Sequence, residues 1–183
     1  INGTAIKLPY SNMAIAQNYL AAYSISETLG INRNIILQQL QKVPIYPGRG
    51  EIVLKGELNF INDTYNANLA SCMNGINAAI KMDYNRTILV LGDMLELGAQ
   101  AKDEHIKLGN FIDSLSVNAV FGIGKNIKYT LDVIKSSNVF IKHFTNKKDL
   151  VNMLKSYCKK NDIVYVKGSR GMKMEQIIFD KEF

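Results

Sequence analysis

The 183-residue sequence lacks several features that mark particular protein classes. No segment is long and apolar enough to cross a membrane as a helix, and no secretory leader is visible, so we expect neither a membrane span nor secretion. The only two cysteines, Cys72 and Cys158, form no Cys-x-x-Cys pair and lie among apolar positions. This usage favours buried structural thiols in a reduced, cytoplasmic protein.

Histidine is equally scarce, which limits the chemistry that the chain can carry alone. His105 lies on the apolar stripe of an expected helix, three residues before Leu108, and His143 ends an expected strand. We expect His105 to be a packing residue rather than a base. No His and Cys cluster has metal-ligand spacing, and no Ser-His-Asp set is apparent, so the sequence assigns no metal ligand and no catalytic residue.

A complete nucleotide-binding motif is also missing. Gly122-Ile123-Gly124-Lys125 resembles a phosphate loop, but a Walker A motif needs four residues between its first Gly and the Gly-Lys pair, followed by Ser or Thr. A dinucleotide fingerprint needs a third Gly and a later acidic residue, and neither is in place. We therefore do not interpret this segment as a phosphate site.

Positive charge is concentrated near the end of the chain. Residues 1–141 carry 12 basic and 11 acidic side chains, whereas residues 142–183 carry 10 and 5. This surplus indicates either a solvated basic face or a surface that attracts anions such as nucleotides and carboxylates. No basic run is interleaved with aromatic residues, so we expect no nucleic-acid partner.

What the sequence does contain is a regular alternation of strand and helix patterns. The spacing of apolar residues predicts helices over 12–29, 33–42, 69–82, 102–115, 126–136 and 147–158, and a short helix near Gly171. Apolar runs predict strands at 52–54, 58–61, 87–91, 117–123, 139–141 and 163–166. This order predicts an α/β fold: a Rossmann-like, mostly parallel sheet with helices on both faces.

The clearest linker is Pro44-Ile45-Tyr46-Pro47-Gly48-Arg49-Gly50, with two prolines and two glycines in seven residues. We place a domain boundary there, which separates a helical segment at 1–46 from an α/β domain at 47–183. The chain starts at Ile1 rather than Met, so we expect it to be a piece of a longer protein.

Three loops at the expected carboxyl ends of strands could carry function, because ligands bind at that edge of a parallel sheet. They are Asn-Asp-Thr-Tyr-Asn-Ala-Asn at 62–68, Gly-Asp-Met-Leu-Glu-Leu-Gly at 92–98 and Lys-Gly-Ser-Arg-Gly at 167–171. Simpler interpretations exist: a helix cap by Asn68, a loop that covers the sheet edge, and a solvated turn. Against the last, a Lys, an Arg and backbone amides at a helix start suit a carboxylate or phosphate.

Together the three loops resemble, in order and spacing, the signatures of the Mur ligase family, in its D-Ala-D-Ala-adding branch. Pro-Gly-Arg at 47–49 is similar to the family's entry into its C-terminal domain, and Leu8-Pro9 with 18–22 to the end of its central ATP-binding domain. The resemblance implies a monomeric cytoplasmic enzyme of peptidoglycan synthesis that joins D-Ala-D-Ala to a UDP-linked muropeptide. It also implies ATP, Mg²⁺ and an acyl phosphate, with the metal ligands in missing N-terminal and central domains.

The resemblance also implies the roles of particular residues. For ATP these are Asn18 at the base, Arg49 at the hinge and Asp63 at the ribose. For D-Ala-D-Ala they are Arg170 with Ser169 at the carboxylate, Tyr65 over the methyl groups and Asn66 near the amine. Lys167 is a candidate for contact with the acyl phosphate.

One residue and one short segment depart from the family pattern. Leu69 stands where the family usually has Pro, and 12–15 replace the family's Gly-x-His-Asn, which weakens the adenine assignment. The alternative function is a free-standing Rossmann-like module that binds an anion or nucleotide without catalysis. An upstream Gly-Lys-Thr loop in the full reading frame would distinguish the two.

Overall fold

The sequence folds into two units, Ile1–Ile45 and Tyr46–Phe183, in a computed structural model that describes residues 3, 5–6, 13–44, 46–181 and 183. Unit 1 contains α1 (Met13–Thr28) and α2 (Arg33–Leu40). Tyr19 and Tyr23 of α1 pack with Ile36, Leu37 and Leu40 of α2, so each helix buries one apolar stripe against the other. The side chain of Asn32 accepts a hydrogen bond from Asn34 N and caps α2.

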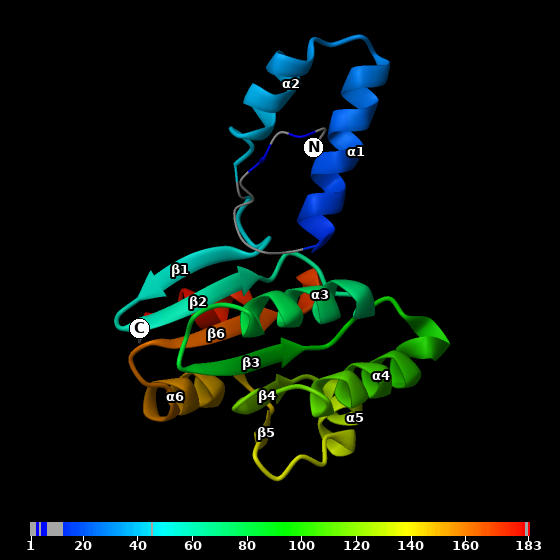
Figure 1. Cartoon of the computed structure of the whole chain (residues 1–183). Helices are drawn as coiled ribbons and strands as arrows, with labels where there is room; N and C mark the ends of the chain where they lie inside the picture. Colours follow the sequence, from blue (N-terminus) through cyan, green and yellow to red (C-terminus); the bar gives the residue numbers. More distant parts are fainter. Residues whose placement is uncertain (1–2, 4, 7–12, 45, 182) are drawn as a thin grey trace. The chain divides into compact units, whose positions relative to one another are not determined.

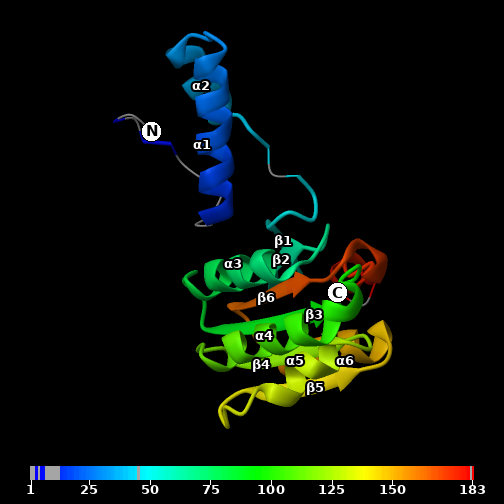
Figure 2. The ribbon, with the colours of Figure 1, turned by 90° about the vertical axis from the view of Figure 1, so that its right-hand side faces the viewer.

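Unit 2 is a six-stranded sheet with helices on both faces, which confirms the predicted fold class (Figures 1 and 2). Its strands are β1 (Glu51–Lys55), β2 (Leu58–Asp63), β3 (Arg86–Gly92), β4 (Ala119–Ile123), β5 (Phe140–Phe144) and β6 (Asp162–Lys167). Its helices are α3 (Leu69–Ile80), α4 (Ala101–Asp113), α5 (Ile127–Val133), α6 (Lys147–Tyr157) and α7 (Glu175–Ile178), with 3₁₀ turns at Gly98–Gln100 and Arg170–Met172.

The strands lie in the order β1-β2-β6-β3-β4-β5, which can be followed from top to bottom in Figure 1. Only β1 is antiparallel to its neighbour, because a tight turn at Gly56 joins it directly to β2; all other pairs are parallel. The last strand of the sequence therefore inserts between β2 and β3. This insertion brings the ends of β2, β6 and β3 together.

Alternate side chains of the strands supply two separate cores. Ile61, Leu89 and Tyr165 face α3, α4 and α5, whereas the core on the other face packs against α6 and α7. The strand members of that second core include Phe60, Ile88, Val90, Phe121, Val164 and Val166. β3 is buried from Thr87 to Gly92, as a strand covered on both faces must be.

The structure corrects some predicted boundaries. β5 runs to Phe144 rather than ending at 141, because all five of its residues pair in parallel with 119–123 of β4. The polar Lys142 and His143 hide the second half of this strand from a prediction that relies on apolar runs, although backbone pairing is indifferent to their polarity. α5 ends at Val133, three residues earlier than predicted.

Candidate functional site

The three motif loops lie side by side at one edge of the sheet. β2 ends at Asp63, β6 at Lys167 and β3 at Gly92, and these strands are neighbours in parallel. The loops at 62–68, 92–98 and 167–171 therefore leave the sheet together. This is the edge at which parallel α/β sheets bind ligands.

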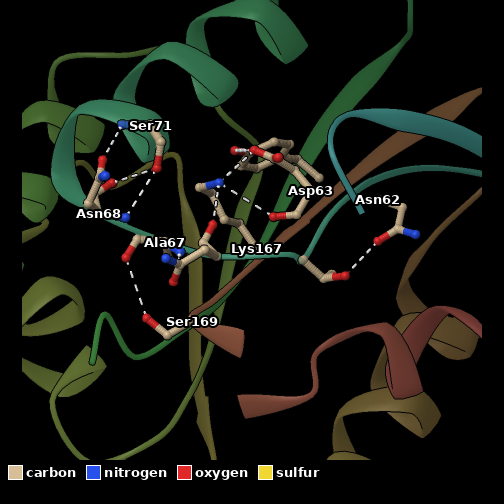
Figure 3. A network of polar contacts seen from close by, with 10 residues as sticks. Asn62, Asp63, Ala67, Asn68, Ser71, Lys167 and Ser169 are labelled. Atoms are coloured by element: carbon tan, nitrogen blue, oxygen red, sulfur yellow. Dashed lines mark hydrogen bonds and ion pairs between the residues drawn. The ribbon is translucent and has the colours of Figure 1, made fainter. Parts of the chain in front are cut away.

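At the base of the site, Lys167 holds the loop at 62–68 in place (Figure 3). Its side chain is 3% exposed, and its ammonium lies 2.8 Å from Asp63 Oδ2 and 2.9 Å from Asn66 O. Tyr165, two residues earlier on β6, donates its hydroxyl to the same Asp63 Oδ2 at 2.7 Å. An ammonium has three donors, and this one directs them at the protein.

These contacts bear on two predicted roles. The contact of Lys167 with an acyl phosphate remains a prediction, but the geometry gives Lys167 a different task, that of fixing the loop. Both hydrogen bonds to the Asp63 side chain end at Oδ2. Oδ1 accepts no hydrogen bond from the described residues, so it can accept one from a ligand.

The same loop is fixed further along by its own side chains. The side-chain oxygen of Asn66 accepts a hydrogen bond from Ala67 N at 2.8 Å, so it is already engaged within the loop. Asn68 caps α3 reciprocally with Ser71, as expected for a helix start. Leu69, which replaces the family's usual Pro, is the first residue of this helix.

Ser169 joins all three loops. Its hydroxyl accepts from Leu95 N at 2.8 Å and lies 3.4 Å from Ala67 O, and its amide donates to Asp93 O at 3.0 Å. Only 4% of the residue is exposed. The predicted contact of Ser169 with the dipeptide is untested, but its hydroxyl already holds the loops together.

Asp93 is the anchor of the loop at 92–98. Its buried carboxylate accepts hydrogen bonds from the amides of Lys125, Asn126 and Ile127 at 2.7–3.0 Å. Gly124 precedes them at a φ of +130°, and a Cβ there would lie 2.3 Å from Asp93 Oδ1. The amides at the end of the Gly-Ile-Gly-Lys segment and just after it thus serve an internal carboxylate.

His105 secures the same loop from α4. Its Nε2 accepts from Met94 N at 3.1 Å, so this nitrogen carries no proton, and Nδ1 then donates to Ala101 O at 2.7 Å. The ring is fully buried. This confirms the interpretation of His105 as a packing residue.

Above this buried network lies a pocket of about 300 Å³. Its lining residues come from all three loops: Tyr65, Asn66, Leu95, Glu96, Ser169, Arg170 and Gly171. The four residues that the sequence predicted for the dipeptide are all among them. Leu95 and Glu96 also line the pocket, whereas the sequence suggested only that Leu95 covers the sheet edge and that Glu96 is a possible ion-pair partner of Arg170.

Arg170 keeps most of its side chain free at this pocket, with 67% exposed. The sequence also allowed a plain ion pair of Arg170 with Asp93 or Glu96. Among the described residues, its guanidinium instead lies 3.7 Å from Glu175 Oε1, a long ion pair. Since exposed ion pairs of this kind contribute little stability, the guanidinium can turn toward a ligand at small cost.

Arg49 packs onto the pocket wall. Its guanidinium lies 4.0 Å from the ring centroid of Tyr65. Tyr65 N also donates to Gly48 O at 2.9 Å, and Gly48 has a φ of +76° with its Cβ position 3.2 Å from that nitrogen. Arg49, one of the three residues predicted for ATP, therefore touches Tyr65, which is predicted for the dipeptide.

The remaining predicted nucleotide residue, Asn18, lies in the other unit. It is exposed on α1. Residues 7–12, on which part of the family resemblance rests, lie outside the described residues. The predicted contact of Asn18 with the base stays a prediction.

Of the two thiols, Cys72 is buried and Cys158 is partly buried. Burial raises the pKa of Cys72 to about 12, and burial likewise raises that of Cys158 to about 12. Both are free cysteines. A thiol with such a pKa is protonated and inert at neutral pH, which agrees with a structural role.

Within the described ranges, no group of three or more His, Cys, Asp or Glu side chains could hold a metal ion. The same search range contains no helix that is long and apolar enough to cross a membrane.

Comparison with known proteins gives a consistent result. The family described as "Mur ligase, glutamate ligase domain" matches residues 48–170. The UDP-N-acetylmuramoyl-tripeptide–D-alanyl-D-alanine ligase of Buchnera aphidicola subsp. Acyrthosiphon pisum is 36% identical, over 96% of this chain and 38% of its own length. The Bacillus subtilis enzyme of the same name is 32% identical, over 89% of this chain and 36% of its own.

Solved structures agree. The crystal structure of MurF from Acinetobacter baumannii aligns with a TM-score of 0.84 at 26% identity, over 96% of this chain and 38% of that one. MurF from Thermotoga maritima in complex with ADP shares the fold, with a TM-score of 0.79 at 24% identity, over 92% and 38%. The chain thus spans less than two fifths of these relatives. With a family match over more than half of its residues, the chain belongs to the Mur ligase family.

Proposed function

We propose that this chain is the C-terminal part of an ATP-dependent ligase that joins D-Ala-D-Ala to UDP-N-acetylmuramoyl-tripeptide through an acyl phosphate in the cytoplasm. Residues 47–183 would form its C-terminal domain, and 1–46 the end of its central ATP-binding domain. The named function of the relatives and their match along nearly the whole chain support the proposal.

The observation that carries the proposal is the pocket at the carboxyl edge of the sheet. It brings together two pairs of neighbouring residues that lie more than 100 positions apart in the sequence: Tyr65 with Asn66, and Ser169 with Arg170. A volume of about 300 Å³ is at the small end of ligand pockets, which suits a dipeptide better than a nucleotide sugar.

The chemistry of the lining matches D-Ala-D-Ala. Arg170 offers a planar fork of donors that can bind the terminal carboxylate bidentately. The ring of Tyr65 can cover the methyl groups. Lys167, Ser169 and Asp93 contribute indirectly, because they fix the loops from which these side chains project.

ATP would lie beside this pocket, where Asp63 Oδ1 can accept a ribose hydroxyl and Arg49 can approach the nucleotide from the linker. The described residues do not fit a Mg²⁺ site, because they gather no cluster of carboxylates. We therefore assign the metal no ligand in this chain and derive no step through it.

The decisive experiment replaces Arg170 by Lys in the full-length protein. If Arg170 binds the dipeptide carboxylate, kcat/KM for D-Ala-D-Ala should fall. The fall should correspond to a loss of about 1.5–3 kcal/mol in transition-state stabilisation, the value of a hydrogen bond to a charged group, while the melting temperature stays unchanged. A variant that melts early but uses the dipeptide normally would show that Arg170 is structural.

The nucleotide side is tested by Asp63→Asn rather than Asp63→Ala. Both variants remove the anion beside Lys167, but the amide oxygen of asparagine can still accept from Tyr165 and Lys167, whereas alanine would leave both donors without this acceptor. We expect the KM for ATP to rise before that for D-Ala-D-Ala changes. The opposite order would remove Asp63 from the nucleotide site.

The 183-residue chain alone should release no phosphate from ATP, since its sequence contains no Gly-Lys-Thr loop. Turnover by the chain alone would contradict its assignment as one part of a larger ligase. A free-standing binding module would instead bind its ligand without any turnover, even in the protein encoded by the full reading frame.

A further inference from the structure

Glu96 is the acidic member of the pocket lining. The other charged lining residue is Arg170, so the pocket presents one cation and one anion. The two do not neutralise each other, because Arg170 pairs with Glu175. Among the described residues, the Glu96 carboxylate has no hydrogen bond or ion pair, and its side chain is exposed.

The backbone at Glu96 is held in an unusual conformation. Its φ of 64° lies in the left-handed region, which is unfavourable for residues that have a Cβ atom. The neighbouring contacts impose this turn: Asp93 is anchored to the amides at 125–127, and Leu95 N is held by Ser169. A rigid loop therefore presents the carboxylate at the pocket.

This charge pattern matches a zwitterion. A dipeptide at neutral pH carries a carboxylate at one end and an ammonium at the other, since an α-amino group has a pKa of about 7.7–8.0. Arg170 can bind the first group, whereas Asn66, the predicted partner of the amine, offers only a neutral amide oxygen that already accepts one hydrogen bond from Ala67 N. An anion is then the suitable acceptor for the ammonium.

We propose that Glu96 binds the free ammonium of the dipeptide, so that the pocket selects zwitterionic ligands with an unblocked amine. The proposal rests on the proposed function, because it takes D-Ala-D-Ala as the occupant. It makes Glu96 a specificity-determining residue that holds the amine in the pocket before the amine is deprotonated for attack.

The test compares Glu96→Gln and Glu96→Gly with wild type in the full-length enzyme. Either variant should raise the KM for D-Ala-D-Ala by about tenfold or more, the effect of losing one charged hydrogen bond, and leave the KM for ATP within about twofold. Glycine suits a φ of 64°, so Glu96→Gly should melt no earlier than wild type. Glu57→Gln, in the turn between β1 and β2, is the matched control and should change neither KM.

A second measurement removes the charge from the ligand instead. Propionyl-D-alanine differs from D-Ala-D-Ala only by the missing amine, and calorimetry should show weaker binding of it to wild type. In Glu96→Gln the difference between the two ligands should shrink to about twofold. If the difference persists in the variant, Glu96 does not read the amine.

The outcomes separate this inference from the proposed function. If Arg170→Lys weakens dipeptide use but both Glu96 variants behave as wild type, the pocket binds the dipeptide and the role of Glu96 is wrong. If the Arg170 and Glu96 variants all use D-Ala-D-Ala normally, the assignment of the pocket itself is wrong.

Discussion

The edge of the sheet has two levels of polar residues that differ in how they are satisfied. The lower level, with Asp63, Asp93, Lys167 and Ser169, is largely buried, and its polar groups are bonded to other parts of the protein. The upper level, with Arg170 and Glu96, is exposed. Arg170 has one long ion pair, and Glu96 has no partner among the described residues. Since a buried polar group must be paired, the lower level mainly builds the site and leaves the upper level to contact ligands. The exception is Asp63 Oδ1, which accepts no hydrogen bond from the described residues and stays open to a ligand.

This division predicts that substitutions in the lower level reduce stability and those in the upper level reduce binding. The largest loss should follow Asp93→Ala, which leaves three backbone amides without their acceptor. We expect a loss of about 4 kcal/mol in the free energy of unfolding, measured by urea denaturation.

Asp93→Asn provides the control for that experiment. Its remaining oxygen can still accept from Asn126 and Ile127, both of which bond to Oδ1 in the wild type. The loss should therefore be less than half of that in Asp93→Ala. Equal losses would mean that the charge, rather than the hydrogen bonds, holds the loop.

The next largest effect is expected for Lys167→Met. The substitution keeps the apolar stem but leaves Asp63, 18% exposed, without its cation, and we expect a loss of about 3 kcal/mol. Lys160→Met is the matched control, because its pair with Glu57 spans 4.0 Å with both side chains largely exposed.

Denaturation of both lysine variants would measure the difference between a buried and an exposed ion pair. No change is expected for Lys160→Met. If Lys167→Met unfolds at the same urea concentration as wild type while losing ligase activity, Lys167 belongs to the ligand-binding level, as the acyl-phosphate prediction requires.

The smallest effect is expected for the exposed stack of Arg49 on Tyr65, which belongs to neither level. Arg49→Ala should cost about 0.5–1 kcal/mol in unfolding free energy, the usual value of an exposed cation–π contact. A double-mutant cycle with Tyr65→Leu isolates this contact. A coupling energy of zero would show that the two side chains stack without stabilising each other.

Much of the fold could be predicted from the sequence, because local patterns encode it. The apolar run at 87–91 predicted a strand, and it forms the buried centre of β3. The apolar stripe of 69–82 predicted α3. β5 was only partly predicted, since Lys142 and His143 interrupt its apolar pattern and only pairing with β4 reveals its length.

The candidate site divides in the same way. The sequence alone identified the three loops, since unusual polar residues follow apolar strands and resemble a family signature. It could not show that Ser169 and Lys167 face inward while Arg170 faces the pocket, because burial depends on which loops become neighbours.

The sequence by itself thus determined the elements, the family and the loops that carry function. Only the tertiary structure decided which side chains support the site and which face a ligand. The physical reason is the insertion of β6 between β2 and β3, which brings residues about 100 positions apart into hydrogen-bonding distance. Partners that distant leave no local pattern. Asp93, whose amide partners follow β4 at 32–34 positions along the chain, likewise emerged as an anchor only from the fold, as did Glu96 as a lining residue.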